Sequence, residues 1–313
     1  MGAHHTAPPV ARLPPPLTME QRVSFDRHEK DALGRDVVVD RPPQRVVSLV
    51  PSETESVAAM IGLERLVGRT DFCEEPSGSI ARVPSVGGTK KHDVEKVVAL
   101  RPDLVLANQE ENGRADVEAL IARGLNVFVS FPCTVAESLA HLERTARLLH
   151  VETERVPEIA ALRAALRRAE SAREAPPVRV FAPIWKEPWM TFDGRTYASD
   201  LLRVAGAENV FADRARRHPL AADLGRAEAK PTDRDTRYPR FELDEVRARS
   251  PELVLLPDEP YRFGPDEARE LDALGTGARV VFVSGKDLFW YGVRAAGAID
   301  RLAALFDEHR ERS

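Results

Sequence analysis

The chain has 313 residues and a net charge of −5, with 43% hydrophobic and 30% charged residues. This composition is typical of a globular protein, and the length suits two domains of ordinary size. The net negative charge does not suit binding to nucleic acid, so we expect no nucleic-acid partner. No apolar run approaches the roughly 20 residues of a membrane span, so we expect no membrane insertion. Two cysteines, Cys73 and Cys133, are too few for a disulfide framework.

Residues 1–22 are predicted to be a disordered tail, because they hold many prolines and too few apolar side chains to order themselves. The tail lacks the basic start and the apolar core of about 7–15 residues that mark a secretory signal, and it lacks a lipid-attachment cysteine. As it stands, the sequence predicts a cytoplasmic location. A periplasmic or cell-surface location is the expectation if a signal was removed or lies upstream.

The first ordered elements are two expected strands, 37–39 and 45–50, on either side of a proline-rich turn. A helix is expected directly after Pro51. Ser52 is its predicted N-cap, and Glu55, three residues on, completes a capping box.

Helical and strand patterns then alternate along the chain. The expected elements are a helix near 93–100, a strand at 104–107, a helix near 115–123 and a strand at 127–130. Such alternation predicts an α/β fold with a largely parallel sheet and helices on both faces. We place this N-terminal lobe at residues 23–150.

Residues 135–174 have almost no strand pattern and are rich in alanine, leucine, arginine and glutamate, which are good helix formers. We divide the segment at residues 151–152 and expect a second helix from about 155 to 173. About 20 helical residues span roughly 30 Å, enough to connect two lobes, so residues 151–176 are predicted to be a connecting backbone helix. A surface helix of one domain is the alternative that composition leaves open.

The alternation restarts after residue 176 and predicts a second α/β lobe at residues 177–313. Its expected elements are strand 178–181, helix 199–205, strand 253–256, helix 266–274, strand 280–283 and a final helix. Residues 212–240 are the least regular part, rich in arginine and aspartate, and we interpret them as a long loop and a candidate lid.

Two stretches of the chain repeat each other 149 residues apart. Residues 94–107 read V-E-K-V-V-A-L-R-P-D-L-V-L-A, and residues 243–256 read L-D-E-V-R-A-R-S-P-E-L-V-L-L. Each reads as a short helix stopped before a proline, followed by a buried strand. A unit that recurs at this spacing predicts two Rossmann-like lobes of similar build that bind a ligand between them.

Ligands of open α/β sheets lie beyond the carboxyl ends of the strands, so polar and aromatic residues after each predicted strand are the candidate binding residues. These candidates are Ser52, Glu53, Thr70, Phe72, Cys73, Thr89, Lys90, Asn108, Glu110, Glu111, Asn112, Trp185, Lys186, Trp189, Glu259, Tyr261, Phe289, Trp290, Tyr291 and Arg294. Each taken alone is also compatible with an ordinary loop. Two features set these strand-exit segments apart. They hold all three tryptophans, which offer flat apolar area to a ring system, and four of the chain's seven lysines, Lys90, Lys91, Lys186 and Lys286.

Cys73 is weighed separately, because a lone cysteine is more often a small buried hydrophobe than a ligand. Its place after a strand, beside Asp71 and Glu74, makes it a candidate contact for a soft metal. The sequence holds no GxSxG, Walker A, GxGxxG or HExxH motif, so we expect no catalytic residues, no enzymatic activity and no intrinsic cofactor.

These segments resemble the class III periplasmic substrate-binding proteins. The opening D-A-L-G-R-D-V-V-V-D-R-P-P-Q-R-V-V-S-L-V-P-S-E-T-E, residues 31–55, and the signature at 94–107 carry the resemblance. V-G-R-T-D-F-C, V-G-G-T-K-K, A-N-Q-E-E-N, W-K-E-P-W-M and F-W-Y-G are similar to a cobalamin-binding-like, or helical backbone metal receptor, branch.

The resemblance implies two Rossmann-like lobes joined by a single long helix, with a cobalamin-like corrinoid, haem, iron–siderophore or other metal chelate bound in the cleft for an ABC importer. It also implies an acidic residue on each lobe that docks onto arginines of the transporter's membrane subunits. The matching positions are Glu95 and Asp244, with Glu245 as neighbour. A favourable charge at a helix N-terminus is the alternative explanation for these acids. The alternative function is a cytosolic corrinoid- or metal-handling accessory protein that uses the same fold without a transporter.

Overall fold

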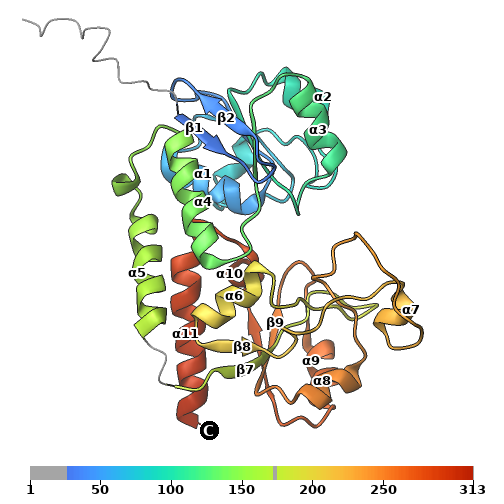
Figure 1. Cartoon of the computed structure of the whole chain (residues 1–313). Helices are drawn as coiled ribbons and strands as arrows, with labels where there is room; N and C mark the ends of the chain where they lie inside the picture. The colour runs from blue at the N-terminus through green and yellow to red at the C-terminus, as the bar shows by residue number, and fades with distance from the viewer. Residues whose placement is uncertain (1–26, 172–174, 313) are drawn as a thin grey trace, which may run out of the picture.

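The computed structural model describes residues 27–171 and 175–312, so the predicted tail at residues 1–22 lies outside the described residues. Figure 1 shows two α/β units, one above the other, with α5 and α11 running along one side. We call the unit with strands β3–β6 the N-lobe and the unit with strands β7–β10 the C-lobe. Within the described residues, no helix is both long and apolar enough to cross a membrane.

The N-lobe is built on a four-stranded parallel sheet with the order β4-β3-β5-β6. Its strands are β3 (Val46–Ser48), β4 (Leu66–Arg69), β5 (Leu104–Asn108) and β6 (Val127–Ser130), and its helices are α1 (Pro51–Ile61), α2 (Val94–Ala99), α3 (Arg114–Ala122) and α4 (Val135–Leu148). The antiparallel pair β1 (Arg27–Lys30) and β2 (Asp36–Val39) lies beside it.

Strand residues of the N-lobe alternate between two hydrophobic clusters, one on each face of the sheet. Leu104 and Leu106 lie in one cluster with Phe128, whereas Val105 and Val127 lie in the other. Because both faces are covered, β5 and β6 are buried at every position, which explains their continuous apolar sequence.

The C-lobe repeats this topology with a parallel sheet of order β10-β9-β7-β8. Its strands are β7 (Val178–Phe181), β8 (Ala207–Asn209), β9 (Leu253–Pro257) and β10 (Arg279–Val283), and its helices are α6 (Tyr197–Val204), α7 (Leu220–Asp223), α8 (Leu243–Arg249), α9 (Pro265–Asp272), α10 (Gly285–Phe289) and α11 (Ala295–Arg312). In both sheets the first strand lies between the second and the third, and the repeated sequence forms α2–β5 in one lobe and α8–β9 in the other. The predicted α/β fold with two parallel sheets is confirmed.

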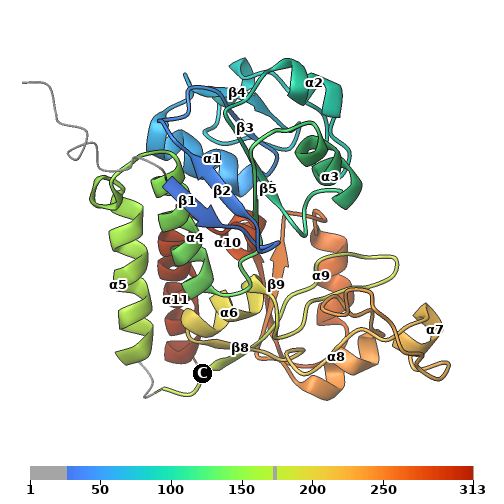
Figure 2. The same ribbon diagram turned by 45° about the horizontal axis from the view of Figure 1, so that its top comes forward.

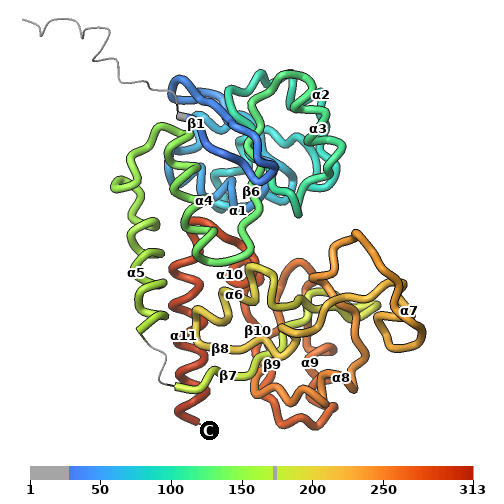
Figure 3. The backbone as a smooth tube through the Cα atoms, viewed as in Figure 1, coloured from blue at the N-terminus to red at the C-terminus, as the bar shows by residue number. Residues whose placement is uncertain are grey.

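Helix α5 (Pro157–Ser171) runs along one side of both lobes and packs against α4 and α11 (Figure 2). Ile159 near its start packs with Leu142 of α4. Leu162 and Ala165, further along, belong to the C-lobe core. The backbone trace in Figure 3 shows α5 following α4 and lying beside it and α11.

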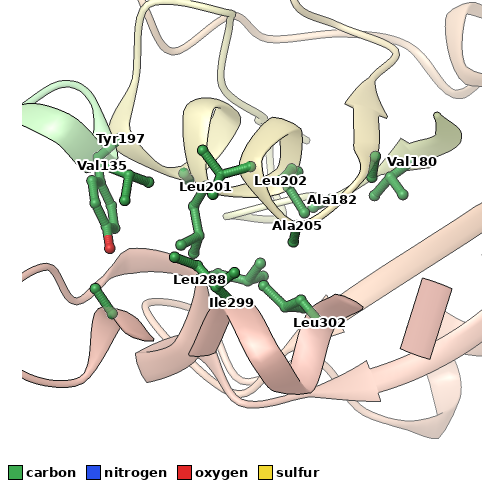
Figure 4. Packing of buried hydrophobic residues seen from close by; sticks show 14 of the residues in the cluster. Val135, Val180, Ala182, Tyr197, Leu201, Leu202, Ala205, Leu288, Ile299 and Leu302 are labelled. Carbon is green, nitrogen blue, oxygen red and sulfur yellow. The ribbon is translucent and has the colours of Figure 1, made fainter. Parts of the chain in front are cut away.

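The largest core cluster joins both lobes to this helical side. Val135 at the start of α4, Leu201 of α6, Leu288 of α10 and Ile299 of α11 converge there (Figure 4). The start of α4 therefore packs on the C-lobe although the rest of that helix covers the N-lobe. This shared packing fixes how the two sheets are oriented relative to each other.

The predicted capping box at the start of α1 is wrong. The helix begins at Pro51, with Val50 in place of Ser52 as N-cap and no side-chain cap. Proline suits the first helical position, because its fixed φ is helical and its missing N–H would be unpaired there. Ser52 consequently lies inside the helix, where its carbonyl accepts a hydrogen bond from Ser56, and Glu55 pairs with Arg294 of the C-lobe.

We predict that Gly285→Ala destabilises the C-lobe, because an added Cβ would lie 2.4 Å from the backbone oxygen of Glu259 and 2.9 Å from its nitrogen. Backbone cannot move aside as a side-chain tip can, so we expect a loss of about 1–3 kcal/mol in unfolding free energy. Chemical denaturation measures it. Gly264→Ala is the matched control, since its nearest atom would be a side-chain oxygen at 3.6 Å. Equal stability of the two variants would contradict the close approach.

Candidate functional site

The two lobes meet where the strands of the N-lobe end, and the segment between α10 and α11 makes the contact. Tyr291 of this segment places its hydroxyl 3.0 Å from Glu53 after β3, 3.0 Å from Asn108 at the end of β5 and 3.0 Å from Ser130 at the end of β6. Three strand exits therefore converge on one side chain from the other lobe. Tyr291 is buried, so water does not satisfy these groups in its place.

Glu53 is a buried carboxylate held by a buried imidazole. Its Oε1 lies 2.7 Å from Nε2 of His141 on α4, and the two side chains are 1% and 2% exposed. Burial alone would raise the pKa of Glu53, but the charge of His141 and hydrogen bonds from His141, Ser130 and Tyr291 outweigh it and hold this pKa below its usual value. The ring of His141 stacks on Phe128 at 5.8 Å, which fixes its orientation.

Two ion pairs flank this buried contact. The Arg294 guanidinium donates to both carboxylate oxygens of Glu55 on α1, at 2.6 and 2.9 Å. Lys286 of α10 lies 2.8 Å from Glu75 in the loop after β4. Hydrogen bonds from Lys286 and from the Ser77 N–H, together with the charges of Lys286 and Arg294, lower the pKa of Glu75. Together with Tyr291, these pairs connect the α10–α11 segment to all four strand exits of the N-lobe.

Gly292 permits this close approach of the two lobes. Its φ is +91°, and an added Cβ would lie 2.3 Å from the Ser56 hydroxyl of α1. Its backbone N–H donates to the Ser138 hydroxyl of α4 at 3.0 Å. The glycine that ends F-W-Y-G is therefore required by both backbone conformation and space.

A second connection between the lobes comes from the irregular segment 212–240. The Tyr238 hydroxyl donates to the carboxyl group of Glu110, which follows β5, and the Arg237 guanidinium lies 3.4 Å from the same carboxyl group. Arg237 also stacks on Phe131 of the N-lobe at 4.7 Å and is held by Asp235 at 2.6 Å. Burial raises the pKa of Glu110 to about 7.

Four aromatic side chains form a continuous row at the strand exits of the C-lobe, and we call them the aromatic ledge: Trp185, Trp189, Tyr261 and Phe263. Trp185 contacts Tyr261 at 5.6 Å, Tyr261 contacts Phe263 at 4.7 Å, and Phe263 stacks on Trp189 at 5.8 Å. Trp185 is 44% exposed, while Phe263 is buried. The ledge therefore runs from the exposed Trp185 to Phe263 in the core and the half-buried Trp189, which packs against the same core.

The ledge lies beside the boundary between the lobes. Glu259, two residues before Tyr261, accepts a hydrogen bond from the Trp290 indole at 2.6 Å and feels the charge of Glu74 from the N-lobe. Phe72, two residues before Glu74, is 62% exposed. Exposed aromatic residues thus occur on both sides of the boundary, Phe72 on the N-lobe and Trp185 on the C-lobe.

Several predicted binding residues are buried in the N-lobe or form hydrogen bonds within it. The Asn112 amide donates to the carbonyls of Leu49 and Thr89, both at 3.0 Å, and its oxygen accepts from the Asn108 N–H. Ser52 and Thr89 are buried. Glu111 is half-buried after β5, and Lys90 donates to the Glu110 carbonyl. These side chains shape the loop that carries Glu110.

Cys73 is 1% exposed and lies in the interior of the N-lobe. Its sulfur is 3.0 Å from the Thr54 hydroxyl and 3.1 Å from that of Thr70, and burial raises the pKa of its thiol. Within residues 27–171 and 175–312, no group of three or more His, Cys, Asp or Glu side chains is arranged to hold a metal ion.

The remaining C-lobe candidates divide between the boundary and the core. Trp290 packs under Lys286 and Arg294, at 5.0 and 5.6 Å. Phe289, its neighbour in sequence, packs on Phe192 in the C-lobe core and so lies apart from Tyr291's contacts. Lys186 lies over the Trp189 ring and pairs with Glu267 and Glu270 of α9.

The acids predicted to dock onto a transporter lie in the first turns of α2 and α8. Glu95 and Asp244 are 70% and 88% exposed, and each pairs with an arginine of its own lobe, Arg123 and Arg247 respectively. Glu245 is less exposed and pairs with Arg214 at 3.0 Å.

Strand-exit reasoning omitted several residues of the boundary, among them Glu75, Ser130, His141, Arg237 and Tyr238. Ser130 ends a strand whose position was predicted, so the same rule would have included it. His141 lies within a helix, and Arg237 and Tyr238 lie in a segment without periodicity, so no local pattern indicated them.

A surface depression of about 530 Å³ lies in the C-lobe, between the segment after β8 and helix α8. It is lined by Asp213, Arg214, Ala215, Arg217, Asp223, Leu224, Gly225, Glu242, Glu245 and Arg249. Arg214 pairs with Asp223 and Glu245 there, and Arg249 pairs with Asp213. This charged and internally paired wall lacks the apolar lining typical of a small-molecule pocket, so we do not assign the ligand to it.

Comparison with known proteins gives consistent matches. The family model described as periplasmic binding protein matches residues 46–237. The vitamin B12-binding proteins of Yersinia pestis (strain Pestoides F) and Yersinia pseudotuberculosis (serotype O:1b, strain IP 31758) are 30% identical to this chain over 178 residues, which cover 54% of this chain and 61% of each relative. The match thus spans about three fifths of the length of these curated relatives.

Solved structures share the fold at lower identity. The periplasmic vitamin B12 binding protein BtuF of Vibrio cholerae has a TM-score of 0.66 at 19% identity, covering 86% of this chain and 98% of that one. The periplasmic heme-binding protein BhuT in complex with two hemes has a TM-score of 0.67 at 24% identity, covering 85% and 98%. Helicobacter pylori CeuE with Ni(II) bound has a TM-score of 0.70 at 15% identity, covering 91% of both chains. At these identities the similarity shows the fold alone.

We predict that Tyr291→Phe lowers the unfolding free energy by about 1–3 kcal/mol, because it removes a hydroxyl on which Glu53, Asn108 and Ser130 depend and leaves buried polar groups unpaired. Denaturant unfolding at neutral pH measures the loss. Tyr261→Phe, the same substitution on the aromatic ledge, is the control. If both variants were equally stable, the Tyr291 hydroxyl would not hold the lobes together.

The lowered pKa of Glu53 predicts a pH dependence of stability. A carboxyl whose folded-state pKa lies below its usual value of 4.5 stabilises the fold above that pH, and the contribution is lost as pH falls through the folded-state pKa. We expect Glu53→Gln to be less stable than the parent at pH 7 and to lose less stability between pH 5 and pH 3. Unfolding curves across this range test it, with the exposed Glu118→Gln as control. Parallel pH profiles for the parent and Glu53→Gln would refute the assignment.

Proposed function

Because the chain belongs to the periplasmic binding protein family, we propose that it is a substrate-binding protein that captures a metal chelate, such as a cobalamin-like corrinoid, between its two lobes. The aromatic ledge is the observation that carries this proposal. Flat side chains fixed at one end in a core and exposed at the other provide a rigid surface for a planar ring system. The ligands named for the vitamin B12-binding and heme-binding relatives are ring chelates of this kind.

The strand exits support binding better than catalysis. Glu53 and His141 resemble an acid–base pair, but both are buried and bound to each other, out of reach of a substrate. The Cys73 thiol has a raised pKa and lies among threonine hydroxyls, which is the opposite of an activated nucleophile. The mechanism is therefore non-covalent capture, with ring contacts from Trp185 and Phe72.

We further propose that the protein works at the outer face of the membrane and delivers its ligand to an ABC importer. Glu95 and Asp244 support this role because they are exposed and occupy equivalent first turns in the two lobes, as the sequence repeat requires. Each pairs with an exposed arginine, and such surface pairs are weak enough to exchange for arginines of a partner.

We predict that cyanocobalamin, haemin or a ferric siderophore quenches the tryptophan fluorescence of the purified protein in a saturable manner. All three tryptophans lie on or next to the aromatic ledge, so a bound chromophore lies within energy-transfer range of each. We expect Trp185→Ala to weaken binding roughly tenfold, the loss of one good stacking contact. Leu220→Ala, at an exposed position of α7, serves as control.

The outcome of this titration decides between the proposals. Saturation by one ligand identifies its class. The absence of a saturable response to any of the three would refute capture of a ring chelate and favour an accessory or interaction role for the same fold.

A further inference from the structure

The irregular segment 212–240 contacts the N-lobe through two adjacent side chains that follow a long exposed stretch. Residues 225–235 are exposed, whereas Arg237 and Tyr238 are half-buried. The Tyr238 hydroxyl donates to the Glu110 carboxyl group, and the Arg237 guanidinium lies 3.4 Å from the same group and 4.7 Å from the Phe131 ring. Arg237 and Tyr238 therefore hold this segment against the loops after β5 and β6.

The backbone connects these two side chains to the aromatic ledge. Arg240, two residues after Tyr238, pairs with Met190 in an antiparallel bridge, and Met190 pairs in the same way with Trp185 at the exposed end of the ledge. Two backbone pairs thus lie between Tyr238 and Trp185. A shift of Tyr238 relative to Glu110 changes how the exposed end of the ledge is placed against the N-lobe.

Releasing this contact leaves its polar groups with partners. Arg237 keeps both carboxylate oxygens of Asp235, at 2.6 and 3.0 Å, and the Tyr238 hydroxyl and the Glu110 carboxyl group become accessible to water. The Tyr291 contact differs, because parting Tyr291 from the buried Glu53 would leave polar groups unpaired inside the N-lobe. Separation at Arg237 and Tyr238 therefore costs less free energy than separation at Tyr291.

We propose that Arg237 and Tyr238 form a releasable clasp between the lobes, distinct from the Tyr291 contact, and that its release uncovers the loop that carries Glu110 and the thiol of Cys133. Cys133 lies between β6 and α4, is half-buried, and has its sulfur 3.7 Å from the Arg237 guanidinium. Tyr291 holds the lobes together, whereas the clasp controls access to the exits of β5 and β6. The clasp is a property of the protein's own contacts and does not depend on the identity of a ligand.

The charges around Glu110 give the clasp a pH dependence. Burial in the closed contact raises the pKa of Glu110 from its usual 4.5 to about 7, and release returns it toward the usual value. The closed form therefore holds this proton more tightly, so its stability is fully present below pH 4.5 and is lost as pH rises through 7. The groups that face Glu110 are Arg237, Tyr238 and Asp235 from segment 212–240, Glu111 and Lys90 from the N-lobe loops, and Cys133.

The labelling rate of Cys133 in the purified protein tests the clasp. Dithiodipyridine reacts with accessible thiols at acidic as well as neutral pH. We expect Tyr238→Phe, which removes the hydroxyl without changing the charge, to raise the Cys133 rate about tenfold at pH 5.5, as for the loss of one hydrogen bond to a carboxyl group. Tyr261→Phe, the same substitution on the aromatic ledge, is the control and should keep the parent rate. Equal rates for the parent and Tyr238→Phe overturn the clasp.

The second cysteine separates release of the clasp from loss of the fold. Cys73 is 1% exposed in the interior of the N-lobe, so it reacts only when that lobe unfolds. We expect Tyr238→Phe to accelerate Cys133 and to leave Cys73 unreactive, as identified by mass spectrometry of the labelled peptides. Acceleration of both thiols to the same extent would mean that the variant unfolds as a whole, which contradicts a separate clasp.

The pH dependence is read from the ratio of the Cys133 rates in Tyr238→Phe and in the parent, because this ratio cancels the ionisation of the thiol itself. We expect the ratio to fall toward one between pH 5.5 and pH 7.5 as the clasp of the parent loosens. A ratio that stays constant over this range contradicts control by Glu110. Neither rate requires a ligand, so the clasp can fail this test while capture of a chelate stands, and the fluorescence titration can fail while the clasp stands.

Discussion

The structure depends on one buried contact, the insertion of the Tyr291 hydroxyl among Glu53, Asn108 and Ser130. Tyr291 comes from the C-lobe and forms hydrogen bonds with residues at three strand ends of the N-lobe. It thereby fixes both the distance and the angle between the lobes. The contact is stable because the Glu53 carboxylate is compensated by His141, and an uncompensated buried charge there would cost several kcal/mol. Gly292 completes it, since any side chain at that position would collide with Ser56 of α1.

The repeated topology explains why this boundary is also the candidate binding surface. In each sheet the second strand lies on one side of the first strand and the third strand lies on the other side, so the loops after the first and third strands diverge. Ligands of parallel α/β sheets bind at such switch points. Residues after β3 and β5 in the N-lobe, and after β7 and β9 in the C-lobe, therefore face the same boundary, and they include Glu53, Glu110, Trp185 and Glu259.

Aromatic and charged residues have separate roles at this boundary. The aromatic ledge offers apolar area that needs no partner, whereas Lys186, Lys286 and Arg294 each neutralise a carboxylate and stack on a tryptophan ring. Lys186 and Lys286, two of the lysines at the predicted strand exits, thus stabilise the walls of the site. A basic side chain near a site is evidence for an anionic ligand only when it is not already paired.

Local sequence was sufficient for the elements and the architecture. The strands expected at 127–130 and 178–181 coincide with β6 and β7, because a buried parallel strand is a continuous apolar run bounded by turn residues. The repeat at 94–107 and 243–256 was sufficient to predict two lobes of one topology. Where a terminal detail depended on the preceding turn, as at Pro51, the local rule chose the wrong capping residue.

The tertiary structure alone decided which side chains meet. Phe289 and Tyr291 are two residues apart in one motif, yet Phe289 packs into the C-lobe and Tyr291 enters the N-lobe, because the turn between α10 and α11 reverses their directions. His141 and Glu53 are far apart in sequence, as are Tyr238 and Glu110, and their contacts exist only because the two sheets are packed in one orientation. Residue type and strand position are properties of a local segment and can be read from it, whereas the partners of Glu53 and Glu110 follow from the packing of both lobes against the helices α4, α5 and α11.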